Sequence, residues 1–526
     1  MNSPSSLSLP APRSRYFTVR FFKGCCRFVF SRRMVWLLAI LVSLGVLLYQ
    51  YENWNGAREL REVRARMIAR AGTDDFRTLQ PAIVQEEENF FAIPVIKSWR
   101  VPATNKDVAG GYTHTFPGDK MLPDKYDAPP EARTPGRWRL DWAAWEKRRI
   151  KAGKPVPAGQ SAAAVVKAEI GDSRGVLPQL IAGLDRPSSQ AIPSWKAAYE
   201  AAGGDILKMG LPAFSQIFST QEALALHLRT AALTGDAAKT RDVAGVMLRL
   251  GTAFSDSTIL ANLVGLAINN VTLSALNEAL ACRTLTDHDL RRITEWLAVT
   301  NDVAQVESMF RFQMLATDEA FTLYKSSGQE KSPVRDRWLG SLRDRKDFTA
   351  WQFTTALTLG PSGWWNCNHA FFLENALLSS GEPGDEGWRA GAKGAETAQR
   401  RTSRASILYA NGNFMVLNPR RSLASLHAPA INHLWNHAAD NLFHRRCAIL
   451  TCALRRHQLA HGTFPATLAE LDAAFLPSPQ TDPAKAGAPM GYRLTEKGFL
   501  LWSVGNDRND DGGDADKDWL WSHEVM

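Results

Sequence analysis

The sequence predicts a mainly α-helical protein with a single transmembrane helix near its N-terminus, a large irregular helical body and a small C-terminal α+β module with antiparallel strands. Three features predict this fold: an uncharged apolar run, a long region with apolar residues three and four apart, and a final region of short apolar runs between turn residues. The 526 residues are 45% hydrophobic and 22% charged, which are ordinary globular values. Wholesale disorder is therefore excluded, and six cysteines are too few for a disulfide-dense miniprotein.

Residues 1–33 form a basic tail that we expect to stay in the cytoplasm. The tail contains seven Lys and Arg residues and no acid, and the first acidic residue of the chain is Glu52. Subtracting these seven charges from the formal net charge of +9 leaves about +2 for the other 493 residues. A nucleic-acid-binding body should carry its own basic face, so we expect no nucleic-acid partner.

Residues 34–51, MVWLLAILVSLGVLLYQY, are predicted to be a transmembrane anchor. As a helix this run is about 27 Å long, which is enough to cross the hydrocarbon core of a bilayer. Trp36 lies near one end and Tyr49 and Tyr51 at the other, where aromatic rings prefer the membrane interface. Because basic residues stay inside, we expect a single-pass protein of the bacterial inner membrane with its bulk in the periplasm.

A cleaved signal peptide and a buried helix of a soluble protein are the alternatives to an anchor. A signal peptide needs a small-x-small cleavage site after the apolar run, and here the run leads into ENWNGARELRE. This flank favours an uncleaved anchor.

Residues 52–160 are expected to contain a juxtamembrane helix followed by an extended segment. Strong helix formers fill residues 52–71, and we expect this helix to lift the body off the bilayer. Residues 100–160 are rich in Pro and Gly and lose periodicity. We expect extended chain draped on a domain there, because four aromatic residues favour burial: Tyr112, Phe116, Tyr126 and Trp138.

Residues 161–444 are predicted to be an irregular helical body of antiparallel hairpins. Apolar residues spaced three and four apart are interrupted by short turns such as Gly235-Asp236, and Thr286 or Asp287 could cap a helix. In the C-terminal module, residues 445–526, FPATLAELDAAF is expected to be a short helix. GYRLT and GFLLWSVG are expected to be two antiparallel strands joined near Glu496-Lys497-Gly498.

Spaced motifs near the C-terminus carry a family resemblance. They are Arg456-His457-x-x-x-His461-Gly462-x-Phe464-Pro465, Leu468-x-x-Leu471, Asp482-Pro483, Gly491-Tyr492-Arg493, Gly498-Phe499, Trp502-Ser503-Val504-Gly505 and Asn506-Asp507-x-Asn509-Asp510-Asp511-Gly512-Gly513. This pattern, over roughly residues 445–515, resembles the C-terminal part of the major pseudopilins of type II secretion. It also looks like the ending of large membrane-anchored bacterial proteins of unknown function.

The N-terminus departs from the pseudopilin pattern. A pseudopilin has a Gly at the peptidase cut and a Glu five residues into the mature helix, whereas here Gly24 is followed by Val29 at that place, and the apolar run has no acid. The resemblance therefore implies a borrowed C-terminal module and not a pilus subunit.

An acidic loop in this module is a candidate calcium site. Residues 507–512 match D-x-[DN]-x-[DN]-G, the start of a calcium loop. The expected oxygen ligands are the side chains of four residues and one carbonyl group: Asp507, Asn509, Asp511, Asp518 and the carbonyl of Gly513. We expect a structural calcium ion, and the alternative is a solvated acidic turn.

Six of the eleven histidines fall between residues 427 and 461, namely His427, His433, His437, His444, His457 and His461. The residues His433, His437, Asp440 and His444 are spaced 4, 3 and 4, so they share a helical face that could bind a metal or supply a general base. The alternative is a polar helix face. We recognise no complete catalytic signature, and we assign no catalytic residue.

Four cysteines lie on the predicted outer side, and they could form disulfides or remain buried thiols: Cys282, Cys367, Cys447 and Cys452. Taken together, the sequence predicts an anchored envelope protein with an extracytoplasmic scaffold or interaction domain, associated with a secretion or pilus-like machine. Its expected partners are the membrane and other proteins. The alternative is a membrane-tethered hydrolase that uses the histidine-rich helix 427–461.

Overall fold

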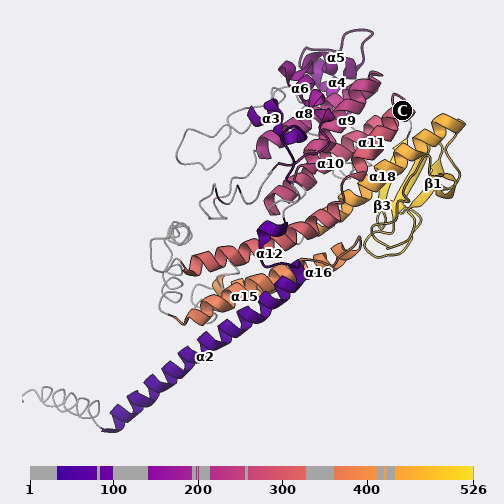
Figure 1. The fold of residues 1–526 in the computed structure, drawn as a ribbon. Coiled ribbons are helices and arrows are strands. Elements are labelled where there is room, and N and C mark those ends of the chain that lie inside the picture. Colours follow the sequence, from indigo (N-terminus) through magenta and orange to yellow (C-terminus); the bar gives the residue numbers. More distant parts are fainter. Residues whose placement is uncertain are drawn as a thin grey trace, which may run out of the picture.

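The computed structural model describes residues 32–79, 83–98, 140–191, 197, 200, 214–254, 259–326, 360–410, 420–421 and 433–524. The protein is mainly α-helical and ends in a small antiparallel sheet, which confirms the predicted fold class. The sheet lies on the opposite side of the body from the free end of helix α2 (Figure 1).

The predicted anchor is part of one unbroken helix, α2, which runs from Arg32 to Ala71. Its apolar side chains are exposed from Val35 to Tyr51; Trp36, for example, is 71% exposed. Among the described residues, this is the helix that is long and apolar enough to cross a membrane. Figure 1 shows the anchor half of α2 projecting away from the body.

The second half of α2, expected to be a helix that stands between the apolar run and the body, is itself packed into the body. Its buried residues Leu60, Val63, Met67 and Ala71 recur every three or four positions, and this apolar stripe packs into the body. The partners are α12 (Asp302–Ser326) and α15 (Ser362–Ser379), which lie beside it in Figure 1. High helix propensity identified this segment as a helix in the sequence, but burial of its apolar stripe determines where the helix packs.

Helical hairpins build the upper body, as predicted. The helices are α8 (Phe214–Leu233), α9 (Ala237–Thr252), α10 (Ile259–Ala281) and α11 (Asp287–Ala298). Gly235, with φ of +77°, makes the turn between the first two. Thr286 caps α11 through a capping box with Asp289, so Thr286, and not Asp287, is the cap.

Shorter helices cover these hairpins: α3 (Pro94–Ser98), α4 (Trp142–Lys151), α5 (Ala162–Ile170) and α6 (Val176–Ala182). The expectation of extended chain is wrong for residues 142–151. Asp141 accepts a hydrogen bond from the Ala144 backbone N–H and so caps α4, and Trp145 is buried. The four aromatic residues for which burial was expected, Tyr112, Phe116, Tyr126 and Trp138, lie outside the described residues.

Helix α18 (Leu434–His461) runs through the middle of the molecule and crosses the expected module boundary at residue 445. It packs against α10, α11 and α12, and α16 (Gly387–Ala410) lies beside it. The C-terminal module therefore shares its long helix with the helical body.

The sheet has the order β1-β2-β3, with β1 (Gly491–Thr495), β2 (Gly498–Ser503) and β3 (Trp519–Glu524), all antiparallel. The first two strands are confirmed, with Gly491 opposite Trp502, and the third was not predicted. The short helix expected in residues 464–475 is only a 3-10 turn, Leu468–Glu470.

The four described cysteines are buried free thiols. Of the two alternatives, disulfides and buried thiols, the second therefore holds. Burial raises the pKa of Cys452 to about 12 and raises that of Cys447 well above its ordinary value. At neutral pH these thiols are protonated and unreactive.

Candidate functional site

The junction between α2, α12 and α15, which we call the anchor joint, brings two helix backbones into direct contact. A Cβ atom added to Gly363 would lie 1.9 Å from the Glu52 carbonyl oxygen, and one added to Gly56 would lie 2.2 Å from the Gly363 carbonyl oxygen. Only glycine permits this approach, because any side chain would occupy the space of the facing backbone. The helix that carries the anchor is thus seated directly on α15.

Glu52, the first residue after the apolar run, is a buried acid at this contact, with 5% exposure. Its carboxylate accepts hydrogen bonds from Arg420 Nε at 2.8 Å and from Trp364 Nε1 at 3.2 Å. The next side chain, Asn53, accepts from the Gly363 backbone N–H at 2.9 Å. These hydrogen bonds and the charge of Arg420 compensate the cost of burying the Glu52 carboxylate beside the apolar run.

Ion pairs continue along the joint. Asp318 of α12 lies 2.7 Å from Arg64 of α2 and 2.8 Å from His369 of α15. Burial acts to raise the pKa of Asp318, but the bond and charge of His369 and those of Arg64 outweigh it, so the pKa lies below its ordinary value. One carboxylate therefore links all three helices.

Further up the joint, Arg70 lies 3.1 Å from Glu307 of α12 and also donates to the Ser380 and Gly381 carbonyl oxygens. No local pattern indicates these pairs, because their members lie more than 230 positions apart in the sequence.

In the acidic loop, backbone N–H groups and one indole N–H donate hydrogen bonds to several carboxylate oxygens. Asp507 accepts from the Asn509 N–H at 3.1 Å, and Asp510 accepts from Trp502 Nε1 at 2.8 Å. Asp518 Oδ2 accepts from the N–H groups of Gly513 and Asp514, at 2.8 and 3.2 Å. These bonds fold the loop back onto the start of β3.

Two of the predicted calcium ligands retain an oxygen suited to a cation. Asp511 Oδ2 and Asp518 Oδ1 are buried without a hydrogen-bond partner, and Lys517 Nζ lies 2.9 Å from the other oxygen of Asp511. Asp507 and Asn509, by contrast, are exposed. Within the described ranges, no three His, Cys, Asp or Glu side chains are grouped closely enough to hold a metal. Six-fold calcium coordination would therefore require Asp507 and Asn509 to turn inward.

Two motifs of the pseudopilin resemblance, Asp482-Pro483 and Ser503-Val504-Gly505, meet in the structure. The Asp482 carboxylate is 1% exposed and accepts hydrogen bonds from Ser503 Oγ at 2.5 Å and from the Val504 N–H at 2.9 Å. Arg389 of α16 donates to the carbonyl oxygens of Ala484 and Gly505. The body therefore holds this part of the module through backbone carbonyl groups.

The histidines of α18 do not gather into one site. His433 and His437 are exposed, while His444 is buried beside Trp521 with its Nδ1 2.7 Å from the Asp440 carbonyl oxygen. The rings of His457 and His461 lie 4.4 Å apart at the far end of the helix. His427 lies outside the described residues.

A buried serine–histidine pair lies elsewhere, in the turn between α5 and α6. Ser173 Oγ is 2.7 Å from His227 Nε2 of α8. Ser173 has φ of +51°, a strained value for a residue with a side chain. The turn reads Gly171-x-Ser173-x-Gly175, the G-x-S-x-G string of serine hydrolases, which we overlooked in the sequence.

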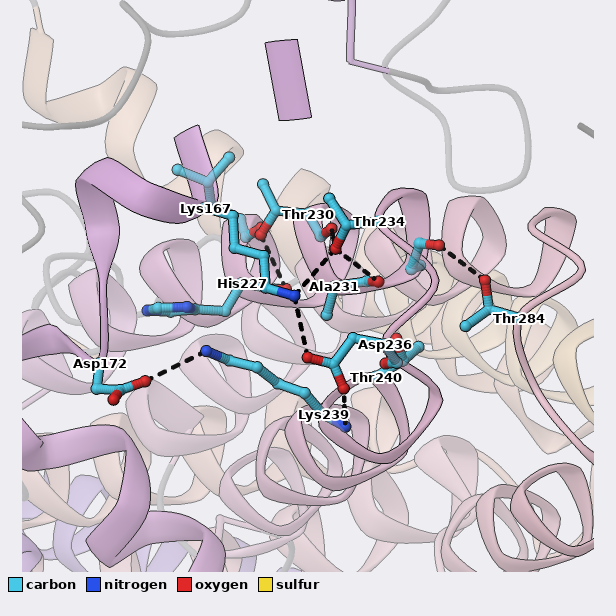
Figure 2. Close-up of polar contacts among 12 residues, drawn as sticks. Lys167, Asp172, His227, Thr230, Ala231, Thr234, Asp236, Lys239, Thr240 and Thr284 are labelled. Carbon is cyan, nitrogen blue, oxygen red and sulfur yellow. Dashed lines mark hydrogen bonds and ion pairs between the residues drawn. The ribbon is translucent and has the colours of Figure 1, made fainter. Parts of the chain in front are cut away.

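Charged side chains lie around His227 (Figure 2). Lys239 lies 3.3 Å from Asp172, and Lys167 lies 3.0 Å from Asp236, which caps α9. Burial and the charge of Lys239 lower the pKa of His227 to about 4, against the opposing charge of Asp172. His227 is therefore neutral at pH 7, with its Nδ1 buried and without a hydrogen-bond partner.

A neutral histidine bonded to a serine can accept the hydroxyl proton, as a general base does. Ser173 is 7% exposed and His227 1% exposed, and no carboxylate bonds His227 Nδ1 as in a catalytic triad. The hydrogen bond between Ser173 and His227 is therefore first a structural contact, which holds the α5–α6 turn against α8.

Comparison of the chain with protein-family models, with curated proteins and with solved structures gives no match.

Proposed function

We propose that this chain is a single-pass membrane protein of the bacterial envelope whose helical body is an extracytoplasmic scaffold for other proteins. The observation that carries the proposal is the continuity of α2, whose exposed apolar half leads without a break into a half that is built into the body. Because the helix is continuous, the position and tilt of the anchor fix those of the whole body. A tethered scaffold needs such a rigid connection.

The basic tail, residues 1–33, supports a cytoplasmic N-terminus and an extracytoplasmic body. The C-terminal sheet supports an association with a secretion or pilus-like machine, because the motifs Asp482-Pro483 and Ser503-Val504-Gly505 contact one another there.

Reporter fusions test the location of the body. Alkaline phosphatase joined after Met526 should be active in cells, and green fluorescent protein at the same place should be dark, because each folds on one side of the membrane only. The protein should also stay in the membrane fraction after alkaline carbonate washing. A fluorescent fusion that is released by the wash would contradict the proposal.

We also propose a structural calcium ion in the acidic loop. The two partnerless carboxylate oxygens, on Asp511 and Asp518, support it. Calorimetry of the full chain in lipid nanodiscs should show calcium binding that Asp511→Ala and Asp518→Ala both abolish. Glu496→Ala, in the exposed β1–β2 turn, is the matched control and should bind normally. Absence of binding by the folded wild-type protein would reduce the loop to a solvated acidic turn.

A membrane-tethered hydrolase is the second candidate function. The contact between Ser173 and His227, and not the histidine-rich helix, is the observation that favours it. A fluorophosphonate probe should label wild-type protein and leave Ser173→Ala unlabelled if the serine is a nucleophile. Equal labelling of both proteins, or of neither, would eliminate this candidate.

A further inference from the structure

One end of the body adjoins the end of the apolar run. We call it the membrane-facing end, and it consists of Tyr51 and Trp54 of α2 and Ser362 and Trp364 of α15. We propose that the membrane-facing end rests in the lipid headgroup layer, so that the bilayer surface is a second partner of the body besides the anchor. The inference depends on the proposed membrane span of α2.

The first argument is the absence of a spacer. The last exposed residue of the apolar run is Tyr51, and the next residue, Glu52, is already buried in the body. One residue of helix advances only about 1.5 Å. The first turn of α15, which touches Glu52 and Asn53, therefore lies at the level where the apolar run ends.

The second argument is the kind of side chain present at this level. The Tyr51 and Trp54 rings lie 6.3 Å apart, and both are more than half exposed. Arg58 places its guanidinium 5.7 Å from the centre of the Trp54 ring. Trp and Tyr rings partition to the headgroup region, where an apolar ring face and a polar edge are both satisfied.

The third argument is charge. The first carboxylate after the apolar run along the chain, on Glu52, is buried and paired with Arg420, so it does not face the lipid phosphates. Helix α15 begins at this level with the positive end of its dipole. Aromatic rings and positive charge together suit the phosphate and glycerol layer of a bilayer.

Spin labels at three depths test the inference in the full chain reconstituted into phospholipid vesicles. The parent protein carries Cys25→Ser and Cys26→Ser, and it should take up little label because its remaining cysteines are buried. Single cysteines then replace Val42 within the apolar run, Ser362 at the membrane-facing end and Lys497 in the distant β1–β2 turn, all three exposed. Collisions with dissolved oxygen and with a water-soluble nickel complex report the depth of each label.

We expect the Val42 label in the hydrocarbon, the Ser362 label at the phosphate level and the Lys497 label in water. A Val42 label in the hydrocarbon with a Ser362 label as water-exposed as that at Lys497 would overturn the inference and leave the membrane span intact. A Val42 label in water would overturn the span itself and the inference with it.

A spacer insertion gives a second measurement. Seven helix-forming residues placed between Tyr51 and Glu52 would add about 10 Å and nearly two full turns, so the anchor joint keeps its partners. The Ser362 label should then move from the phosphate level into water, while the Val42 label keeps its depth. An unchanged Ser362 label would show that something other than the distance from the span sets its environment.

Discussion

The anchor joint and the C-terminal sheet are attached to the body in different ways. At the anchor joint, helix backbones touch through two glycines, and ion pairs such as Arg64–Asp318 cross between helices. At the sheet, large rings fill the interface: Phe499 and Trp521 are fully buried, and Trp521 Nε1 donates to Thr451 of α18 at 3.0 Å.

The two attachments should therefore respond to different perturbations. A joint of close backbones and ion pairs is sensitive to an added methyl group and to pH. A joint of buried rings is sensitive to loss of side-chain volume. The following predictions test this contrast, beginning with the largest expected effect.

Trp521→Ala should be the most damaging substitution, because it empties a fully buried site between β3 and α18. Loss of a buried aromatic side chain costs about 3–5 kcal/mol of unfolding free energy. Urea unfolding in detergent would measure it, with Leu494→Ala, at a 44% exposed site of the same sheet, as control. Equal losses in the two variants would show that the sheet is not held by this ring.

Gly363→Ala should separate α2 from α15, since its Cβ would overlap the Glu52 carbonyl group. Overpacking of this kind costs about 1–3 kcal/mol. Limited proteolysis within residues 52–71 should become faster. Gly45→Ala, on α2 with no atom within 4 Å of the new Cβ, is the control. If both variants resist protease like the wild type, the close approach of the two backbones is not needed to hold α2 against α15.

Asp318→Asn should weaken the anchor joint by about 1 kcal/mol, a charge-assisted contact discounted for partial exposure. The folded-state pKa of Asp318 is lowered, so its contribution is fully present above its unfolded pKa of about 4. That contribution is lost as pH falls through the folded-state pKa. Denaturation of wild type and variant from pH 7 to pH 3 should show their stabilities converging. A constant difference over this range would contradict the assigned role.

Lys517→Gln should have the smallest effect, a severalfold gain in calcium affinity. The Lys517 ammonium lies 2.9 Å from Asp511 and competes with a cation for that carboxylate. Calorimetry would measure the gain, with Lys497→Gln as the control at a distant exposed site. Weaker calcium binding by Lys517→Gln would mean that the lysine organises the loop instead of competing.

Local patterns predicted much of the architecture. The repeat of apolar residues identified the helices from α8 to α11, and the turn at Glu496-Lys497-Gly498 identified the first two strands. Strand β3, WLWSHE, was missed because no short turn joins it to β2: the acidic loop separates the two strands, and the pairing is seen only in the structure.

The site residues were harder to predict than the fold. The acidic loop was visible because its ligands lie within twelve residues, but the pairing of Asp510 with Trp502 and of Asp511 with Lys517 was not. For the Ser173–His227 contact, the string Gly171-x-Ser173-x-Gly175 could have identified the serine. No sequence pattern indicated the histidine, which lies 54 residues away.

The sequence alone determined the apolar run, the basic tail and the succession of helices, because each depends on neighbours within a few turns of chain. Tertiary structure decided what covers each helix. Glu52 is paired with Arg420, 368 residues away, and Gly56 faces Gly363. Periodicity shows that a helix has an apolar face, but it carries no information on which distant helix buries that face or which distant charge completes it.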